Sequence, residues 1–201
     1  IFGIKPADSG KAWIKGKPQT LRSPHQASCL GIGFCPEDRK TDGIIAAASV
    51  RENIILALQA QRGWLRPISR KEQQEIAERF IRQLGIRTPS TEQPIEFLSG
   101  GNQQKVVIGK WLATHPEVII LDEPTKGIDI GSKAAVHQFM SELVSQGLAV
   151  IMVSSELPEV MGMADRIIVM HEGLMVAEYR AGEATAETIV SAASGIGQEA
   201  A

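Results

Sequence analysis

The chain has 201 residues and a formal net charge of −2, with 43% hydrophobic and 22% charged residues. These values are ordinary for a globular chain with a buried core, built as one domain or as a domain with a subdomain. The charge gives no reason to expect nucleic acid as a partner. No apolar run approaches the roughly 18 residues that span a membrane, and the first residues lack the basic and apolar regions of a signal peptide.

The first 48 residues predict short strands and one short helix. Ala12–Ile14 has the character of a short strand followed by a turn. Ser23 and Pro24 are typical of a helix start, with serine as the N-cap and proline at the first helical position. Ile32–Cys35 favours another strand, which leads into a charged loop.

Two glycine-rich stretches superficially resemble phosphate-binding loops. A Walker A loop has four residues between its glycines and a Ser or Thr after its lysine. Here six residues separate Gly3 from Gly10, and Ala12 follows the lysine. Residues 31–33 form a G-x-G without the third glycine of a dinucleotide fingerprint. Neither stretch is therefore predicted to bind phosphate.

The two cysteines, Cys29 and Cys35, are too few for a disulfide framework, and no histidine-rich segment beside them indicates a metal site. Both fall in or near apolar runs, so we expect both to be small core residues. A reducing, cytoplasmic setting is the simplest interpretation.

Residues 49–115 predict a block of helices. Apolar residues recur at helical spacing in three runs; Gly63 separates the first two runs, and Gly85 ends the second. The apolar positions are Val50, Ile54, Ile55 and Leu58, then Ile76, Phe80, Ile81 and Leu84, then Val106, Val107, Ile108, Trp111 and Leu112.

The remaining residues alternate strands with helices. Residues 118–121 and 148–153 are apolar runs typical of strands that are buried on both faces of a parallel sheet. Amphipathic spacing predicts a helix between them over residues 132–146. The later predicted elements are a helix over 157–163, a hairpin over 167–179, a last helix over 184–194, and a disordered tail over 195–201.

This order of elements predicts an α/β fold with a mostly parallel sheet and an inserted helical part. We expect residues 1–48 and 116–201 to form a partial α/β core. We expect residues 49–115 to form the helical subdomain.

Residues 98–105, which read LSGGNQQK, have the chemistry of an anion-binding helix start. Ser99 is a good N-cap type, and Gly100 and Gly101 let another molecule approach the backbone closely. The first N–H groups of the helix and its positive dipole end suit a phosphate.

Two acids end the apolar run over residues 118–121. Asp122 and Glu123 follow the carboxyl end of a buried strand, where open α/β sheets place their ligands. Pro124 ends the strand, so the two side chains need not alternate between faces. A metal ligand and a water-activating base could therefore be placed here. Either motif alone is also typical of a plain turn, but the two in this order are specific.

Residues 98–104 resemble the signature motif of ABC-transporter ATPases, residues 119–125 their Walker B strand, and residues 126–131 their D-loop. The resemblance runs along essentially the whole chain. It is greatest to the second, C-terminal nucleotide-binding half of the double-cassette ATPases of bacterial monosaccharide importers. Residues 35–40, which read CPEDRK, point to the arabinose branch, with xylose, ribose and galactose relatives close behind.

The resemblance implies an ABC-ATPase fold, similar to P-loop NTPases, with ATP and Mg²⁺ as cofactors. Asp122 would position Mg²⁺ through water, and Glu123 would act as the general base. The signature would contact ATP that is held by the opposite cassette of a head-to-tail pair. The residues implied to bind nucleotide are Ser99, Gly100, Gly101, Asn102, Gln103 and Asp129, with Glu37 and Ser155 at two positions where the family pattern changes.

Three features depart from the usual cassette. Glu37 stands where a Gln normally senses Mg²⁺, although an acid can still hold a cation, and Ser155 stands where a switch His normally contacts the γ-phosphate. The Walker A loop and the first strands would lie upstream of Ile1, so we expect a truncated chain. These departures predict an asymmetric pair of cassettes. This half would supply an intact signature motif to the ATP site of its partner, while its own ATP site would be impaired. The intact Glu123 argues mildly against complete loss.

Two functions of different classes remain open. The chain is either the energy-coupling ATPase half of a sugar importer, or a non-catalytic cassette that completes the site of its partner. Soluble cassette proteins of repair or translation fit less well. The implied partners are the first, N-terminal cassette of the same protein, the transmembrane permease at the cytoplasmic face of the inner membrane and, indirectly, a periplasmic sugar-binding protein. Residues 38–53 would meet the permease, or would form a solvated charged loop.

Overall fold

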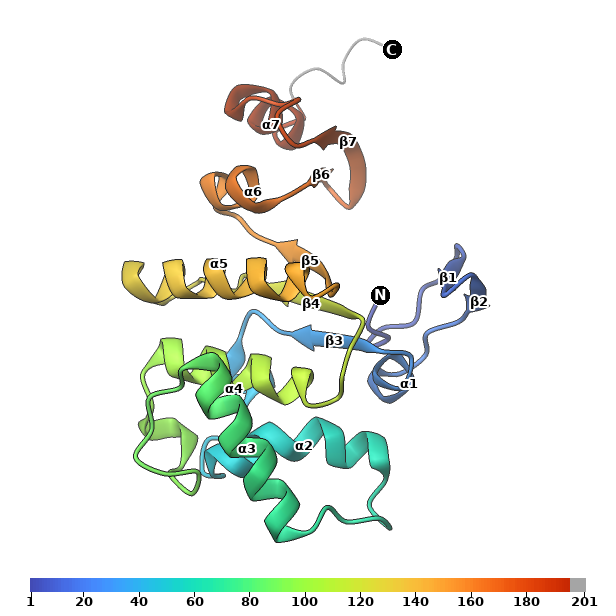
Figure 1. The fold of residues 1–201 in the computed structure, drawn as a ribbon. Coiled ribbons are helices and arrows are strands. Elements are labelled where there is room, and N and C mark those ends of the chain that lie inside the picture. Colours follow the sequence, from blue (N-terminus) through green and yellow to red (C-terminus); the bar gives the residue numbers. More distant parts are fainter. Residues whose placement is uncertain (196–201) are drawn as a thin grey trace. The chain divides into compact units, whose positions relative to one another are not determined.

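The computed structural model describes residues 1–195, except for the side chains at positions 130 and 132 (Figure 1). The chain forms two compact units, Ile1–Val153 and the part from Ser154 onward. Of the tail expected at 195–201, residues 196–201 lie outside the described part. Among the described helices, none is long and apolar enough to cross a membrane.

A parallel three-stranded sheet lies at the centre of the first unit. Its strands are β3 (Ile32–Cys35), β4 (Val118–Asp122) and β5 (Ala149–Val153), in the order β3-β4-β5. The middle of β4 is buried, as its apolar run predicts, and each fully buried aliphatic side chain there contributes about 1.5–3 kcal/mol. The register pairs Cys35 with Leu121 and Asp122 with Val153, so the three carboxyl ends lie at one edge.

The amino-terminal segment packs against this sheet. β1 (Ala12–Ile14) and β2 (Lys17–Gln19) form a hairpin whose two turn residues both have positive φ, which is typical of the tight turn that matches strand twist. In α1 (Pro24–Cys29), Ser23 caps the helix by accepting from the backbone N–H of Gln26, as predicted. The expectation for Cys29 is wrong: Cys35 is buried on β3, but Cys29 is exposed at the end of α1.

The helical part begins with a π-helical turn, η1 (Arg39–Gly43), where the sequence predicted only a charged loop. It continues through α2 (Val50–Arg62), α3 (Arg70–Leu84), the 3-10 turn η2 (Ile95–Phe97) and α4 (Gly100–Leu112). Ser49 and Glu52 form a capping box at the start of α2, and Gly85 ends α3 in the left-handed conformation. The three long helices pack on one another, and α4 also packs on β3.

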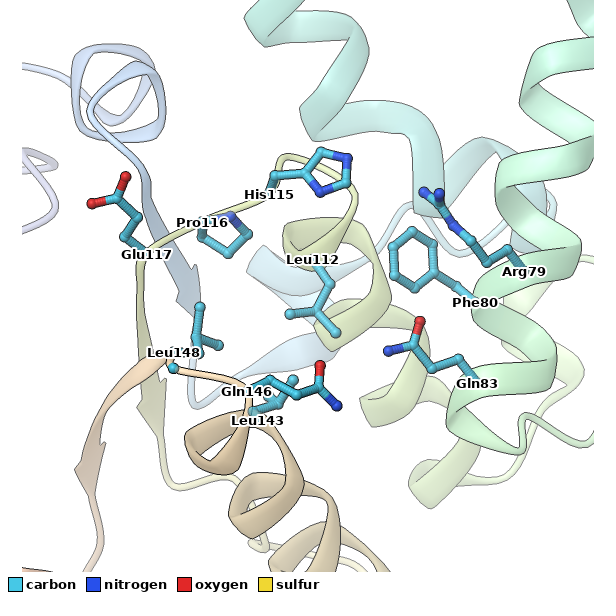
Figure 2. A pocket seen from close by; sticks show the side chains of 11 residues that line it. Arg79, Phe80, Gln83, Leu112, His115, Pro116, Glu117, Leu143, Gln146 and Leu148 are labelled. Carbon is cyan, nitrogen blue, oxygen red and sulfur yellow. The ribbon is translucent and has the colours of Figure 1, made fainter.

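A pocket of about 460 Å³ opens between α3, α4 and the carboxyl end of α5 (Ile130–Ser145), as Figure 2 shows. Phe80, Leu112 and Leu143 form its apolar wall, with Arg79 stacked on the ring of Phe80. Glu117 and Leu148, which precede β4 and β5, also line it. The pocket therefore lies toward the amino ends of the strands, away from Asp122 at the carboxyl end.

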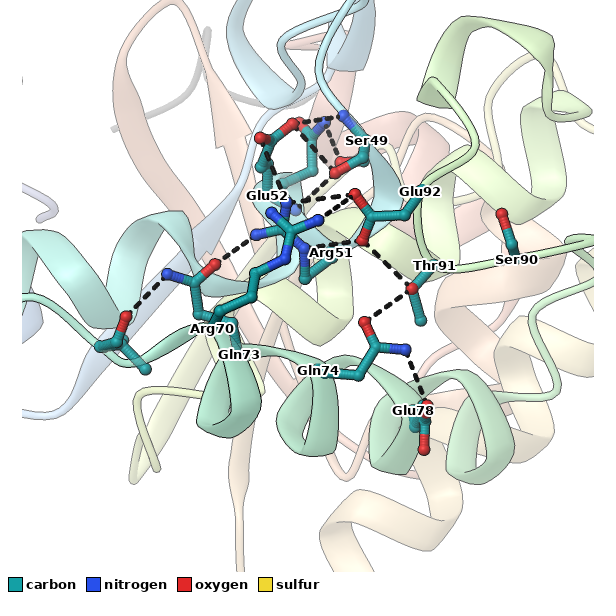
Figure 3. Close-up of polar contacts among 12 residues, drawn as sticks. Ser49, Arg51, Glu52, Arg70, Gln73, Gln74, Glu78, Ser90, Thr91 and Glu92 are labelled. Atoms are coloured by element: carbon teal, nitrogen blue, oxygen red, sulfur yellow. Dashed lines mark hydrogen bonds and ion pairs between the residues drawn. The ribbon is translucent and has the colours of Figure 1, made fainter.

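A polar network centred on one buried arginine joins α2, α3 and the loop before η2 (Figure 3). Arg51 is only 2% exposed, and its Nε donates to Glu92 Oε1 at 2.8 Å while its Nη1 donates to Gln73. Arg70 reaches the second oxygen of Glu92 at 2.7 Å. Nearby, the buried Asn53 donates to three main-chain carbonyls of the loop before α2 and accepts from the N–H of Ile45.

The second unit contains α6 (Leu157–Met163), the antiparallel pair β6 (Arg166–His171) and β7 (Leu174–Arg180), and α7 (Ala186–Ala193). Each element lies close to its predicted position. Ile167 and Val169 of β6 pack with Ile189 of α7 in a small core of their own.

Candidate functional site

Three carboxylates gather at the carboxyl edge of the sheet, and we call them the carboxylate edge: Glu37 after β3, and Asp122 and Glu123 at the end of β4. Partial burial raises the pKa of Asp122, and the nearby charges of Glu37 and Glu123 raise it further. Lys126 acts in the opposite direction on the same group. The site therefore holds more negative than positive charge, and an added cation would relieve the repulsion.

Lys126 forms the counter-charge of the carboxylate edge. Its Nζ lies 2.5 Å from Glu37 Oε1, and this contact raises the pKa of the lysine. The two side chains are 61% and 51% exposed. An ion pair in such a solvated place adds little stability and can exchange its partner readily.

The acids fit Mg²⁺ only as a partial ligand set. Within the described residues there is no group of three or more His, Cys, Asp and Glu side chains placed to hold a metal ion by themselves. Mg²⁺ commonly uses one or two carboxylates and takes its other ligands from water and from substrate phosphates. Asp122 and Glu37 are suited to that kind of site.

The backbone turns sharply at Glu123, which has a φ of 47°. A non-glycine residue in the left-handed region is uncommon and persists when surrounding contacts hold it. Here the N–H of Glu123 donates to Val153 O at 2.8 Å, and its carbonyl accepts from the N–H of Lys126 at 3.1 Å. The side chain of Glu123 thus leaves the simple alternation of β4, as the following Pro124 predicted.

The signature turn, residues 98–103, begins α4 without the expected serine cap. The side chain of Ser99 makes no capping bond to the helix. Instead, Asn102 Nδ2 donates to Ser99 Oγ at 2.9 Å, while Asn102 Oδ1 accepts from the N–H of Arg87 at 2.8 Å. Asn102 therefore fixes the shape of the turn, and the serine does not occupy the N–H groups at the helix start.

Gln103 faces the interior beneath this turn. Its Nε2 donates to the carbonyls of Ile95 and Leu98 at 3.3 and 3.2 Å, and the side chain is buried. It therefore supports the turn from inside. The sequence grouped it with the residues that would touch nucleotide.

The D-loop follows the carboxylate edge and lies beside the signature turn. A Cβ placed on Gly100 would lie 3.7 Å from the carbonyl oxygen of Gly127, whose φ of 68° suits glycine. Asp129 is exposed, and its carbonyl accepts from the N–H of Lys133 in the first turn of α5. The structure thus brings the D-loop and the signature turn together.

Ser155 belongs to the second unit. It follows Ser154, whose Oγ donates to Glu159 Oε2 at 2.6 Å and accepts from the N–H of Glu156 at 3.0 Å. These bonds shape the start of α6, with Ser155 between them in the chain.

Sequence reasoning missed two cationic residues at the site. The sequence places Lys126 in the D-loop, and Arg39 in the CPEDRK motif and in the charged segment over residues 38–53, and it predicts no role for either side chain. Arg39 Nη1 donates to the carbonyl of Lys126 at 3.1 Å, across 87 positions of sequence. In the sequence, the one feature that could have indicated them is that both residues are close to acidic residues along the chain, and this is also common in ordinary surface segments.

Comparison with known proteins gives a consistent result. The sequence pattern of the family described as ABC transporter matches residues 1–126. The galactofuranose transporter ATP-binding protein YtfR of Escherichia coli K12 is 72% identical over 192 residues, which cover 96% of this chain and 38% of that protein. The ribose import ATP-binding protein RbsA of Bacillus subtilis is 46% identical over 195 residues, covering 97% of this chain and 40% of that protein. The chain thus spans well under half of these relatives.

Solved structures show the same fold. A nucleotide-free ATP-binding cassette from an ABC transporter aligns with a TM-score of 0.78 at 24% identity, over 95% of this chain and 77% of that one. An ATP-binding cassette in its ADP conformation aligns with a TM-score of 0.74 at 25% identity, over 96% and 76% of the two chains. The predicted α/β cassette fold with a parallel sheet is confirmed.

Proposed function

Because this chain belongs to the ABC transporter family, we propose that it is one nucleotide-binding half of the ATPase that drives a bacterial monosaccharide importer. The names of its relatives, which refer to galactofuranose and ribose, support a sugar as the cargo. Those names give no support to arabinose, so we propose a substrate of the galactofuranose or ribose type. Sugar uptake by cells that lack and regain the gene would test this choice.

The carboxylate edge is the observation that carries the proposal. Asp122 and Glu37 would hold Mg²⁺ together with waters and the phosphates of ATP. Bound there, Mg²⁺ would supply positive charge that offsets the negative charge of the phosphates. Glu123, on its constrained turn, would accept a proton from the attacking water. By its place in the sequence, Ser155 would stand in for the usual switch histidine.

The signature turn would serve a second ATP, held by an opposite cassette. Ser99, Gly100, Gly101 and Asn102 would face its γ-phosphate, with Gln103 supporting the turn from within and Asp129 contributing through the D-loop. We propose that the opposite cassette is a first, N-terminal cassette of the same polypeptide. The greater length of the relatives supports this arrangement.

Glu123→Gln separates an active half from a non-catalytic one. In the full-length polypeptide that carries this chain, loss of the general base should slow ATP hydrolysis at the site of this half by about 10²-fold or more if this half hydrolyses ATP, while the opposite site keeps its own base. An unchanged rate would support the alternative, a cassette that only completes the site of its partner. Ser99→Arg is the matched variant, because it should abolish hydrolysis at the opposite site under both proposals.

Isothermal titration tests which site takes nucleotide. No Walker A pattern occurs within residues 1–201, so Mg-ATP should give no heat with this chain alone. Binding should appear when the first cassette is added. Micromolar binding to the chain alone would contradict the proposed donor role and would place a phosphate site in the amino-terminal segment.

We propose that residues 1–48 and 116–201 act as the nucleotide-binding core, and that residues 49–115 act as a helical subdomain at the cytoplasmic face of the inner membrane. The permease would contact the exposed part of residues 38–53, and a periplasmic sugar-binding protein would act through the permease. Asp38 is less suited to this contact, because its carboxylate caps η1 through the N–H groups of Lys40 and Thr41.

Permease capture can test the exposed part of that segment. Asp42 is exposed and Ile45 is 51% exposed. Asp42→Lys and Ile45→Glu should each reduce capture of the permease in a pull-down. Asp8→Lys and Ile4→Glu, at exposed positions of the amino-terminal segment, are the matched controls. Undiminished capture by both test variants would reject this surface.

A further inference from the structure

One side chain of the charged loop after β3 turns toward the D-loop. Arg39 opens η1, and its Nη1 donates to the main-chain oxygen of Lys126 at 3.1 Å. Its Nε is buried and has no hydrogen-bond partner among the described residues. An arginine on a free surface would keep all of its N–H groups in water, so this placement is specific to the fold.

The space that Arg39 occupies exists because Gly100 has no side chain. A Cβ at that position would lie 2.7 Å from Arg39 Nη2, closer than real Cβ contacts allow. Gly127 is also near, with its own would-be Cβ 4.0 Å from the same nitrogen. The guanidinium of Arg39 in this position therefore requires glycine at position 100, as close approach by a ligand would also do.

Lys126 is held at two points by one loop. Glu37 binds its ammonium group, and Arg39 binds its carbonyl oxygen. Because the Glu37 contact exchanges readily, the hydrogen bond from Arg39 is the contact through which a displacement of the loop after β3 would reach the D-loop, and its guanidinium lies beside the first residue of α4. The positive end of a helix dipole does not attract a cation. The hydrogen bond to the carbonyl of Lys126 therefore holds Arg39 beside the start of α4.

We propose that Arg39 is a positioning residue that couples the carboxylate edge to the signature turn. Through it, the state of the site on this half would set the geometry of the signature that the half presents to ATP on the opposite cassette. The functional part of this statement rests on the proposed function. Arg39 then acts inside the cassette, and the permease surface of residues 38–53 does not include its guanidinium.

Hydrogen exchange on this chain tests the contact without any need for activity. Arg39→Ala should speed exchange about tenfold in residues 124–129 and 98–103, as expected for loss of one charge-assisted hydrogen bond. Lys40→Ala removes the same charge from an exposed neighbour in the same turn and should leave both segments unchanged. Equal exchange in Arg39→Ala and the wild type would overturn the proposal, as would faster exchange in 124–129 alone.

A double-mutant cycle tests the coupling and avoids dependence on one variant. Gly100→Ala should expel the guanidinium and reproduce the exchange pattern of Arg39→Ala at 124–129. The double variant should be no faster than either single variant there, because both remove the same contact. Independent, additive effects would overturn the proposal.

Kinetics of the full-length polypeptide give the functional readout. Arg39→Ala should lower kcat for ATP hydrolysis about tenfold with KM within about twofold, because the signature would meet ATP only after the nucleotide is bound by the opposite cassette. Arg39→Lys, a single-point donor, should restore less than half of kcat. Full rescue by lysine, or an unchanged kcat at unchanged thermal stability, would overturn the coupling role. If the wild-type protein has no ATPase activity, the proposed function is contradicted. The proposed contact of Arg39 is not, because hydrogen exchange tests it without any need for ATPase activity.

Discussion

Two of the ion pairs that join distant segments of the first unit differ in the burial of their cations. Arg51, which is 2% exposed, meets the 47% exposed side chain of Glu92, and Gln73 completes the hydrogen bonds of the arginine (Figure 3). Lys126 meets Glu37 with both side chains more than half exposed. Water screens the second pair and competes for its atoms, so its rupture costs little. If the first pair breaks, water cannot take the place of Glu92 at the buried guanidinium of Arg51.

The contrast separates a structural contact from an exchangeable one. The Arg51 network holds α2, α3 and the loop that leads to the signature turn, so its rigidity fixes where α4 begins. The Lys126 pair covers the carboxylate edge, where a bound cation would compete with the ammonium group for Glu37. A chain built to receive a ligand needs both kinds of contact in one unit.

The largest effect is expected from breaking the pair that the buried Arg51 forms with the half-exposed Glu92. Arg51→Met keeps much of the side-chain volume but removes every hydrogen bond of the guanidinium. The free energy of unfolding should fall by about 2 kcal/mol, less than for a fully buried pair because Arg70 and water still serve Glu92. Urea denaturation of the chain measures it. Arg62→Met, which breaks the exposed pair with Glu72, is the control and should change stability far less.

The helix cap beside Arg51 should have the next largest effect. Ser49→Ala removes the hydroxyl half of the capping box at the start of α2, while the N–H at position 49 still donates to Glu52, and it should cost about 1 kcal/mol. The hydrogen bonds from Ser49 hold the pKa of Glu52 below its usual range, with Arg51 as a lesser cause. That depressed pKa adds stability at neutral pH that is lost as the pH falls through it. The backbone N–H at position 49 is the largest cause of the lowered pKa and remains in the variant, so Ser49→Ala should lose only slightly less stability on acidification than the wild type. A greater acid loss would contradict this account.

The sequence predicted the elements better than it predicted the site. The apolar run identifies β4 because a strand buried on both faces needs a continuous apolar stretch, and Gly85 marks the end of α3 because it can adopt the left-handed conformation. The same pattern places β5 correctly but overstates its burial, since Ile151 is 40% and Val153 50% exposed. No local pattern revealed that Arg51 is buried, because its partners come from 22 and 41 positions away. Arg39 was missed for the same reason. From the sequence alone, long cationic side chains are predicted to lie on the surface, because the distant residues that accept their hydrogen bonds are known only from the tertiary structure.

The comparison also makes a pH-dependent prediction for the exposed site. Burial, together with Glu37 and Glu123, raises the pKa of Asp122 above its usual range. A raised carboxylate pKa favours the folded state at low pH, and that contribution is lost as the pH rises through the raised value. Asp122→Asn should therefore stabilise the chain modestly at neutral pH and leave it nearly unchanged in acid. Urea denaturation at both pH values measures this, with Asp8→Asn as an exposed control. A loss of stability at neutral pH would mean that the carboxylate holds the fold together.

The smallest effect on stability is expected from the exposed pair itself. Glu37→Gln keeps the shape of the side chain but removes its charge, so the ammonium group of Lys126 loses its partner to water. Unfolding by urea should show no measurable change. The same variant should lower the pKa of Asp122, because one of the charges that raises it is gone, and this shift can be followed by NMR titration of the carboxyl carbon. Stability that fell as far as in Arg51→Met would place both pairs in the same structural role and remove the distinction between them.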